Sequence, residues 1–445
     1  MIVMKFGGSS VKDATMIRKV TELVKNNLKN EPIVVVSACQ GVTDLLLKSI
    51  NESLEGKLNS FYEIEKLHKQ ILKDLNLDEH LIDDLLFELK NLLTANFYIK
   101  ETGNRLKDHI AFFGERMSSK IIAEFMKNNG INAQQFDSGD LGLITDNNFG
   151  NAGLLPDTYD RIRNSFKEKI TKKNLVPVIT GFGGKTINNE YTTFDRGGSD
   201  YVASIFGAAL KVKEIQIWTD VSGIYSCDPK IVKNPKKIEV MAFEEASELA
   251  YFGAKVLHPK TILPAIELKI PVRVLNTYQP EDKGTLILDQ CKHNEKTKIL
   301  ALSIKNATVI EIKSTRMLNA YGYLEKAFAI FSKHKKSVDM ISTSEITISL
   351  TVDNEQKIDM IINELKEIAN VSSYPNHKII YVLCNPKFEK ENILSEIFSI
   401  SRDINVKIRM LSMCYDTISI GLIVKNEDAI NLVKELHKRL IEEIY

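Results

Sequence analysis

The chain has 445 residues, and 44% of them are hydrophobic, which is enough for two or three ordinary hydrophobic cores. Lys and Arg number 59 against 58 Asp and Glu, so the formal net charge is +1. This balance provides no basic field to hold nucleic acid or an anionic membrane. We therefore expect a globular, multidomain protein that binds neither.

The cysteine pattern and the apolar runs indicate a cytoplasmic protein. The five cysteines are scattered without a CxxC pair, which fits neither a disulfide framework nor a zinc site. No apolar run approaches the roughly 20 residues of a membrane helix, and no signal peptide precedes the first strand-like run.

The N-terminal third predicts an α/β sheet with a helical insertion. Residues 2–6 have the pattern of a strand, a helical pattern follows a glycine turn, and residues 33–36 are strand-like again. This βαβ order implies parallel strands. Residues 61–128 have helical spacing of Leu and Ile, and strand-like runs return at 175–180, 214–219 and 271–275.

The C-terminal third predicts two smaller α+β units. Residues 276–298 turn polar, as expected where few contacts join two domains, and we place the boundary near 295–300. The blocks 307–375 and 378–445 are similar to each other, and each mixes strands with a helix.

The first motif, KFGGSS at residues 5–10, is a strand that ends in two glycines before a helix. Exposed N–H groups and the helix dipole favour anions at such a turn, and Lys5 adds a positive charge. The motif lacks the GxxxxGK[ST] spacing of a P-loop, and a Gly-Gly turn after a strand is often only a turn. From these residues alone both interpretations stay open.

A second glycine turn, TFDRGGSD at residues 193–200, precedes another helical pattern. Arg196 is suited to clamp a carboxylate bidentately and Asp200 to pair with an ammonium group. The alternative is that Asp200 only stabilises the start of the helix and that Arg196 lies on the surface.

Two further motifs suit a nucleotide. WTDVSGIY at 218–225, with Asp228-Pro229-Lys230, follows a strand at the end where open α/β sheets bind ligands. YFGAKVLHP at 251–259 offers Lys255 to a phosphate, although a lone lysine is usually only solvated. We expect His258 to cap or pack rather than to catalyse.

Together with FGER at 113–116 and TGF at 180–182, these motifs resemble, in order and spacing, the aspartate kinases of the amino-acid-kinase superfamily. The resemblance implies an α/β catalytic domain whose largely parallel, eight-stranded sheet lies between helices. Two ferredoxin-like α+β ACT domains follow in that family, and in its lysine-sensitive members the second is assembled around the first.

On this resemblance we expect a catalytic domain at 1–297, with its helical insertion at about 61–128. The regulatory region is expected at 298–445, with one ACT domain at about 307–375 and the other formed by 298–304 and 378–445. Because the chain ends at Tyr445, without a homoserine dehydrogenase, we expect a monofunctional enzyme.

The resemblance also implies the reaction. The γ-phosphoryl group of ATP, with Mg²⁺, passes to the β-carboxylate of L-aspartate and gives 4-phospho-L-aspartate, the first step of lysine, threonine, methionine and diaminopimelate biosynthesis. A carboxylate needs no general base, so catalysis reduces to alignment and charge neutralisation. We assign no protein ligand to Mg²⁺, which usually binds through substrate phosphates.

The resemblance assigns roles to the motif residues. The residues expected around the transferred phosphoryl group are Lys5, Gly7, Gly8 and Asp200. The residues expected around aspartate are Ser37, Thr43, Glu115, Phe182, Arg196, Ser199 and Asp200. The residues expected around the nucleotide are Lys5, Gly8, Thr219, Asp220, Tyr225, Lys230 and Lys255.

Three positions depart from the family pattern. Asp195 stands where a glycine usually precedes the arginine, Phe113 replaces a common histidine, and Lys230 replaces a common arginine. Asp195 adds negative charge beside a dianionic substrate, so we expect it to weaken aspartate binding or the approach of phosphate.

Residues 314–345 resemble the effector-binding part of lysine-inhibited aspartate kinases. The expected effector residues are Met317, Ser337, Val338, Asp339, Thr343, Ser344 and Glu345. Asp339 and Glu345 would pair with the two ammonium groups of lysine, and the backbone of 321–324 with its carboxylate. Alternatively, both are solvated charges and these domains only mediate dimerisation.

Other functions remain to be weighed. Glutamate 5-kinase, acetylglutamate kinase, carbamate kinase and uridylate kinase share the fold, but none combines RGGSD, FGAKVLHP and this tandem tail. A catalytically inactive amino-acid sensor is a further alternative, opposed by the retention of Lys5, Glu115, Arg196 and Asp200. Symmetric self-association, as a homodimer or homotetramer through the ACT domains, is the default expectation.

Overall fold

The computed structural model describes residues 1–195, 197–251, 259–293, 297–317, 321–353, 356–414 and 417–443. The chain forms two compact units that are discontinuous in sequence. The first comprises Met1–Ile224, Glu239–Phe243 and Val256–Cys291, and the second comprises Tyr225–Ile238, Glu244–Lys255 and Lys292–Tyr445. The boundary that we place near 295–300 stays a prediction about the domains.

The first unit is built on an eight-stranded sheet in the order β11-β13-β12-β8-β1-β2-β5-β3. β12 pairs antiparallel with β13, and the other pairs are parallel, which confirms the expected largely parallel sheet. The strands are β1 (Ile2–Phe6), β2 (Pro32–Val36), β3 (Ala133–Phe136), β5 (Val176–Thr180), β8 (Ile215–Thr219), β11 (Val240–Ala242), β12 (Val272–Asn276) and β13 (Thr285–Leu288).

Alternation along β1 assigns its side chains to the two faces of the sheet. Ile2, Met4 and Phe6 join the core formed with helices α1 to α5. The intervening Lys5 is available to the other face, where helix α7 (Gly198–Leu210) contacts β1, β2 and β8. The central strands are buried on both faces, as their continuous apolar sequences require.

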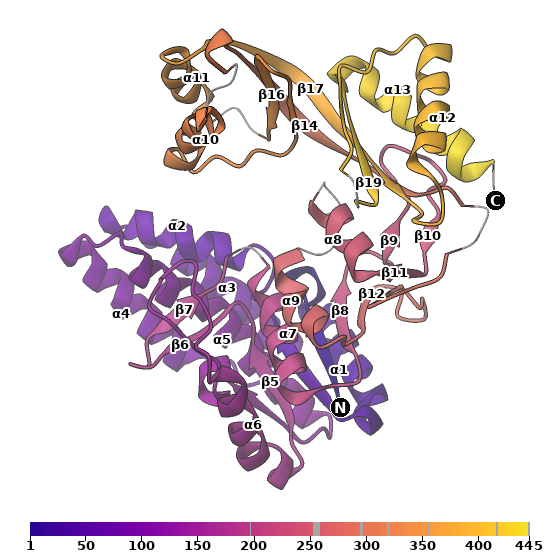
Figure 1. Cartoon of the computed structure of the whole chain (residues 1–445). Helices are drawn as coiled ribbons and strands as arrows, with labels where there is room; N and C mark the ends of the chain where they lie inside the picture. The colour runs from indigo at the N-terminus through magenta and orange to yellow at the C-terminus, as the bar shows by residue number, and fades with distance from the viewer. Residues whose placement is uncertain are drawn as a thin grey trace. The chain divides into compact units, whose positions relative to one another are not determined.

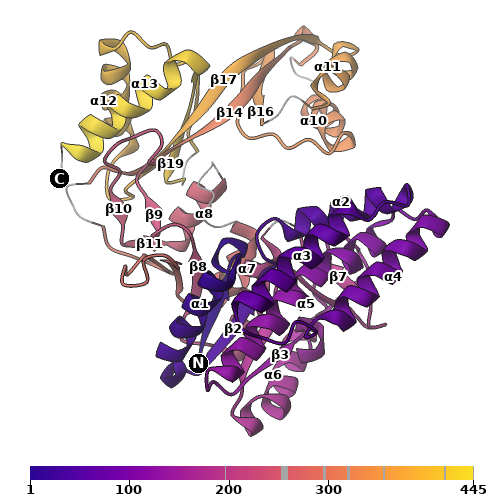
Figure 2. The same ribbon diagram turned by 180° about the vertical axis from the view of Figure 1, so that it is seen from behind.

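The stretch expected to be helical contains three helices, α3 to α5, and two further helices, α1 and α2, precede it. They are α2 (Val42–Leu54), α3 (Asn59–Asp74), α4 (Asp83–Ile99) and α5 (Asn104–Asn128), and α1 covers Ala14–Asn26. Both ribbon views show α2 and α4 side by side at one end of this unit (Figures 1 and 2). The other elements are β4 (Ile144–Thr145), α6 (Thr158–Lys169), β6 (Gly183–Thr186), β7 (Tyr191–Thr193) and α9 (Leu263–Glu267).

The second unit contains a six-stranded antiparallel sheet in the order β15-β16-β14-β17-β19-β18. Its two long strands, β14 (Ile299–Lys313) and β17 (Asn370–Cys384), run through both halves of this sheet (Figure 1). β14 pairs with β17 along its length. Residues 308–313 of β14 also pair with β16, whereas residues 299–304 pair with the part of β17, 380–384, that in turn pairs with β19. This is the pairing that the resemblance implies for the residues near 298–304.

Each half of this sheet has its own apolar core. Ile310, Phe331 and Leu350 belong to the first, and Leu302, Ile397 and Leu432 belong to the second. The halves have the strand orders of two ferredoxin-like ACT domains that share their long strands. Their elements are α10 (Tyr323–Lys333), β15 (Ile341–Thr343), β16 (Thr347–Val352), α11 (Ile358–Lys366), α12 (Lys390–Asp403), β18 (Met410–Ser412), β19 (Ser419–Lys425) and α13 (Asn426–His437).

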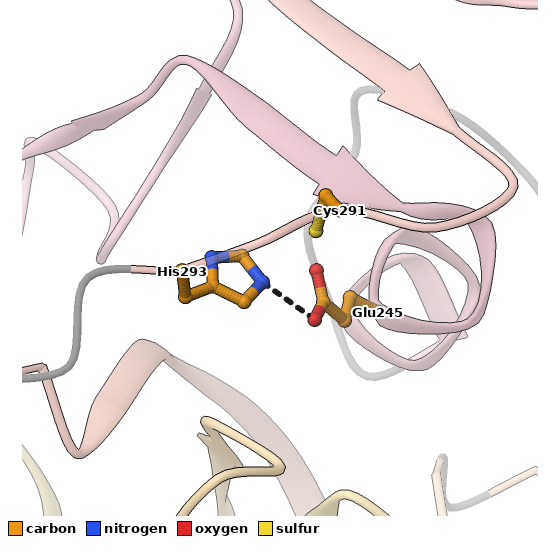
Figure 3. Close-up of side chains that lie close together, drawn as sticks. All are labelled: Glu245, Cys291 and His293. Atoms are coloured by element: carbon orange, nitrogen blue, oxygen red, sulfur yellow. Dashed lines mark hydrogen bonds and ion pairs between the residues drawn. The ribbon is translucent and has the colours of Figure 1, made fainter.

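A smaller part of the second unit comes from residues before the ACT domains. It contains β10 (Lys237–Ile238), which pairs with β9 (Ile224–Tyr225), and α8 (Phe243–Tyr251). Cys227 and Val232 join the core of the second ACT half. On α8, Oε1 of Glu245 lies 2.7 Å from Nε2 of His293 (Figure 3). Among the described residues, no helix is long and apolar enough to span a membrane.

Candidate active site

Loops from four neighbouring strands meet at one edge of the central sheet. The amide of Gly7 donates to the Trp218 carbonyl (3.1 Å), and the amide of Ser37 donates to the Phe6 carbonyl (3.1 Å). The amide of Gly181, which follows β5, donates to the Val36 carbonyl at the end of β2 (2.8 Å). Parallel pairing therefore continues into each loop, at the carboxyl ends where open α/β sheets bind ligands.

A cavity of about 310 Å³ opens at this edge. Eight of the residues expected in the site line it: Lys5, Gly8, Ser37, Thr43, Glu115, Phe182, Ser199 and Asp200. Gly7 is held by its bond to the Trp218 carbonyl but is not among the lining residues. Most of the phosphoryl and aspartate residues assigned by the resemblance are thus brought together.

An ion pair joins the sheet to helix α7 inside this cavity. Nζ of Lys5 lies 2.7 Å from Oδ1 of Asp200, and the two side chains are only 11% and 13% exposed. Alternation along β1 points Lys5 toward α7, and Asp200 occupies the first turn of that helix, where the dipole favours a carboxylate. Each group compensates the charge of the other in a place with little water.

Glu115 reaches the cavity from the middle of α5. Its Oε1 accepts a hydrogen bond from the Ala38 amide (3.0 Å). The preceding Gly114 permits this approach, because a Cβ there would lie 2.6 Å from the Cβ of Ala38. Burial raises the pKa of Glu115 to about 7. Within the described part of the chain its Oε2 has no hydrogen-bond partner, so this carboxyl is suited to a cationic ligand group.

Two helices begin at the cavity. Gly41, at φ +82°, precedes α2, and Gly197, at φ +81°, precedes α7. Thr43 and Ser199 stand in the first turns of these helices and line the cavity. The N-termini of two helices favour negative charge here, and this suits a carboxylate and a phosphoryl group.

The sequence analysis missed the loop that forms one wall of the cavity. The missed lining residues there are Ala38, Cys39, Gln40, Gly41 and Asp44, and Gly197 and Gly198 were also missed. A signal was present, because the strand 33–36 is followed by a glycine and a helix start, the pattern that drew attention to residues 5–10.

Two expected site residues, Arg196 and Lys255, lie outside the described residues, as does His258. Asp195 is exposed and is not among the residues that line the cavity. Phe113, the second departure from the family pattern, is fully buried in the core of the first unit.

The described nucleotide residues fall in both units. At the end of β8, the Thr219 hydroxyl donates to the Asp220 carboxylate (3.1 Å). Tyr225 is half-buried and Lys230 is exposed, and both belong to the second unit. The Lys230 amide donates to the Asp228 carboxylate (2.8 Å), which shapes the loop locally. A shared nucleotide site for these residues stays a prediction.

The expected effector residues differ in how deeply their side chains are buried. Asp339 is buried, with 2% of its side chain exposed, and its Oδ1 lies 2.9 Å from Nζ of Lys305. Burial raises the pKa of Asp339 and the Lys305 ammonium opposes that rise. Met317 and Val338 pack against the core of the first ACT half. The exposed members are Ser337, Thr343, Ser344 and Glu345.

Comparisons with known proteins match this architecture over the whole chain. The amino acid kinase family model matches residues 1–276, and an ACT domain model matches residues 310–360. Aspartokinase 1 of Arabidopsis thaliana is 37% identical, over 99% of this chain and 80% of its own length. Lysine-sensitive aspartokinase 3 of Escherichia coli is 32% identical, over 99% of both chains. The chain belongs to the aspartokinases of the amino acid kinase family.

Solved structures agree with this assignment. E. coli aspartokinase III in complex with lysine and aspartate has a TM-score of 0.84 and 30% identity, covering 99% of both chains. The same enzyme in complex with aspartate and ADP has a TM-score of 0.82 and 30% identity, over 99% of both chains. The chain is accordingly an aspartate kinase that uses MgATP, and the related kinases that share the fold do not account for this full-length similarity.

The burial of Glu115 predicts an unusual titration in this aspartokinase. Its carboxyl should ionise at a pH of about 7, because burial disfavours the charged form. Infrared difference spectra recorded from pH 5 to 9 should show a carboxylate band that appears near that pH and is missing in Glu115→Gln. If the band lost in the variant titrates near the ordinary glutamate value, Glu115 is better solvated than the structure indicates.

Proposed function

We propose that the enzyme binds L-aspartate in this cavity and directs its β-carboxylate at the γ-phosphoryl group of ATP beside Lys5 and Gly8. The observation that carries the proposal is the convergence of Lys5, Asp200 and Glu115 between two helix N-termini. The product is 4-phospho-L-aspartate. The E. coli structure with aspartate and ADP supports the assignment by similarity.

The residues in the cavity supply alignment and positive potential. A β-carboxylate oxygen of aspartate forms a bond to the γ-phosphorus as the bond from that phosphorus to the bridging oxygen of ADP breaks. The carboxylate is already deprotonated, so no general base is required. Lys5, the amide of Gly8 and the helix N-termini stabilise the charge on the phosphoryl oxygens.

The residues present are compatible with Mg²⁺, which usually binds through the phosphates and few protein carboxylates. Asp44 and Asp200 are the carboxylates that line the cavity, apart from Glu115, among the described residues. When bound, Mg²⁺ neutralises phosphate charge. Asp200, already paired with Lys5, holds that ammonium group in place for the phosphoryl group.

The charged groups of aspartate have separate partners in this proposal. Glu115 in its ionised form pairs with the α-ammonium group, and Arg196 holds the α-carboxylate bidentately. The remaining wall residues are Ser37, Thr43, Phe182 and Ser199. Asp195 is exposed and is not among the lining residues, and an exposed charge is screened by water, so we propose that it leaves the enzyme active.

Residues beyond the cavity complete the nucleotide site in this proposal. Thr219 and Asp220 follow β8, next to the strand that carries Lys5. Tyr225 contributes its ring near the adenosine, while Lys230 and Lys255 contribute charge toward the phosphates. The resemblance supports this set, together with the ADP in the E. coli relative.

The activity predicted here is measurable directly. Full-length protein incubated with MgATP, L-aspartate and hydroxylamine should form aspartyl hydroxamate, and glutamate should not replace aspartate. Lys5→Met should lower kcat by about 10²- to 10³-fold with little change in the aspartate KM, because the lost charge acts on the transition state. Arg196→Ala should chiefly raise the aspartate KM.

Lys29→Met serves as the matched control, because Lys29 is exposed and precedes β2, whereas the cavity loop follows the other end of that strand. It should keep wild-type kinetics. Wild-type kinetics in both Lys5→Met and Arg196→Ala would contradict the assigned roles.

We propose further that lysine inhibits the enzyme through the first ACT half, which the lysine-sensitive E. coli relative and its lysine complex support. Asp339 and Glu345 pair with the ammonium groups of the effector. Asp339 then either leaves its present partner Lys305 or pairs with Lys305 and the effector together. The ACT halves also mediate a homodimer or homotetramer. A cytoplasmic location is proposed because the five cysteines are scattered along the sequence without a CxxC pair.

Lysine sensitivity should depend on these two carboxylates. Asp339→Ala and Glu345→Ala should each raise the lysine concentration for half-inhibition by about 10-fold or more, the effect of losing a charged hydrogen bond. The uninhibited kcat should stay near the wild-type value. Glu364→Ala, which removes a carboxylate paired with Lys333 and His334, should keep normal inhibition. Unchanged inhibition in both test variants would show that lysine does not act through these two carboxylates, and would contradict the assignment of this site to lysine.

A further inference from the structure

A small hairpin connects two parts of the cavity wall. Strand β6 begins at Gly183, directly after Phe182, and β7 ends at Thr193, two residues before Asp195. β6 and β7 pair antiparallel, from Gly183 opposite Thr193 to Lys185 opposite Tyr191. The position of this hairpin therefore determines where Phe182 and the turn that leads to Ser199 and Asp200 lie.

One buried carboxylate ties the end of the hairpin to helix α5. Oδ2 of Asp108 accepts hydrogen bonds from the amides of Thr193 (2.9 Å) and Gly150 (2.8 Å). Oδ1 of Asp108 accepts a third from the Thr193 hydroxyl (2.7 Å). Asp108 is 3% exposed and Thr193 is 4% exposed, so water does not replace these bonds readily.

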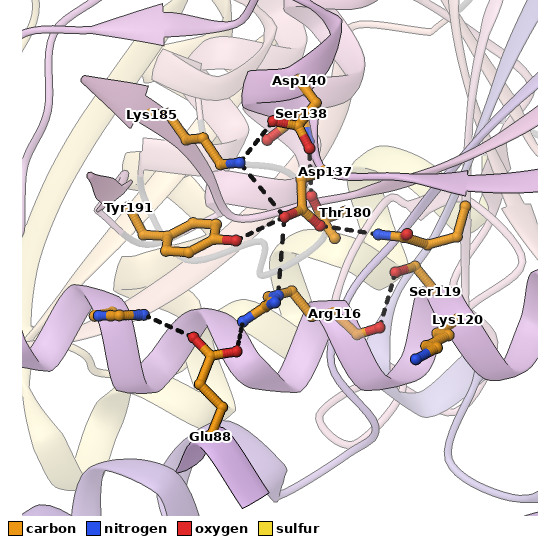
Figure 4. A network of polar contacts seen from close by, with 12 residues as sticks. Glu88, Arg116, Ser119, Lys120, Asp137, Ser138, Asp140, Thr180, Lys185 and Tyr191 are labelled. Atoms are coloured by element: carbon orange, nitrogen blue, oxygen red, sulfur yellow. Dashed lines mark hydrogen bonds and ion pairs between the residues drawn. The ribbon is translucent and has the colours of Figure 1, made fainter. Parts of the chain in front are cut away.

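The start of β7 is tied to the same helix by a second set of contacts. The Tyr191 hydroxyl donates to Oδ2 of Asp137 (2.8 Å), and Nε of Arg116, on α5, lies 3.8 Å from the same oxygen. The Arg116 guanidinium also lies 5.2 Å from the centre of the Tyr191 ring. Figure 4 shows Tyr191, Arg116 and Lys185 directed at Asp137 from different elements. Both ends of β7 are thus fixed relative to α5.

Helix α5 carries Glu115 as well. Asp108 precedes Glu115 by two helical turns, so the two side chains lie on a similar face of the helix. Glu115 forms one wall of the cavity, and the turn that follows Thr193 forms another. The same rigid helix therefore sets the spacing between the two walls.

We propose that Asp108 is a positioning residue for the substrate aspartate: through Thr193 it holds the first turn of α7, with Ser199 and Asp200, in place relative to Glu115. This inference rests on the proposed function of that turn. Asp108 does not line the cavity and touches neither substrate. Its loss leaves three donors without their acceptor, two of them on the buried Thr193, and lets the turn shift; a displacement of about 1 Å costs as much as 10²-fold.

The chemistry of the three contacts predicts which replacement succeeds. In Asp108→Asn, the amide oxygen accepts from the two backbone amides, and the amide nitrogen donates to the Thr193 hydroxyl, which is able to accept. Asparagine therefore preserves all three bonds, whereas alanine removes all of them. Thr193→Val removes only the hydroxyl contact.

The test is steady-state kinetics of the full-length enzyme with each substrate varied in turn. Asp108→Ala should raise the aspartate KM by about 10- to 100-fold while the ATP KM stays within about 2-fold of the wild-type value. Asp108→Asn should restore near-wild-type values, and Thr193→Val should fall between them. Asn96→Ala is the control for loss of a buried polar side chain, because Asn96 bonds Ser53 and the Glu101 amide within the helical insertion.

The outcomes separate the possible failures. Equal changes for aspartate and ATP, or the same changes in Asn96→Ala, would show that Asp108 serves stability alone and would overturn the inference. If Asp108→Ala does not fold, an unchanged aspartate KM in Thr193→Val overturns it instead. Absence of aspartate-dependent turnover in the wild type would refute the proposed function, not the role of Asp108.

Discussion

The active site depends on one buried ion pair, between Lys5 at the end of β1 and Asp200 at the start of α7. The pair forms only if β1 lies in parallel register between β2 and β8, with α7 packed across the same face. A lysine left unpaired in this place would carry a large desolvation cost. The arrangement therefore links correct sheet assembly to the presence of a positive charge where the phosphoryl group is expected.

Helix α5 provides the second constraint, because it places Glu115 while its neighbouring polar residues hold the β6–β7 hairpin.

The regulatory unit is organised around shared strands instead of a buried polar site. Its two ACT halves share the strands β14 and β17, so both halves belong to one continuous sheet. Such a sheet suits a region that has to respond as a whole to an effector.

Periodicity predicted the parallel sheet and the helical stretch because β1, β2 and β5 are apolar runs and α3 to α5 have helical spacing. The motifs predicted many of the cavity residues through the Gly7-Gly8 turn, the glycines that precede α7 and the family resemblance. Asp108 was not predictable, because its partner Thr193 is 85 positions away. The Lys305–Asp339 pair was missed for the same reason, and nothing local indicates that residues 225–238 join the second unit.

The central claim is that L-aspartate lies between Glu115 and Lys5, with its β-carboxylate facing the γ-phosphate. A crystal structure of the enzyme with L-aspartate, Mg²⁺ and a non-hydrolysable ATP analogue tests it most directly. The account predicts the α-ammonium group against the Glu115 carboxylate and the β-carboxylate beside Lys5 and the Gly7-Gly8 turn. Aspartate bound outside this cavity, or in it with its α-carboxylate toward Lys5, would contradict the account.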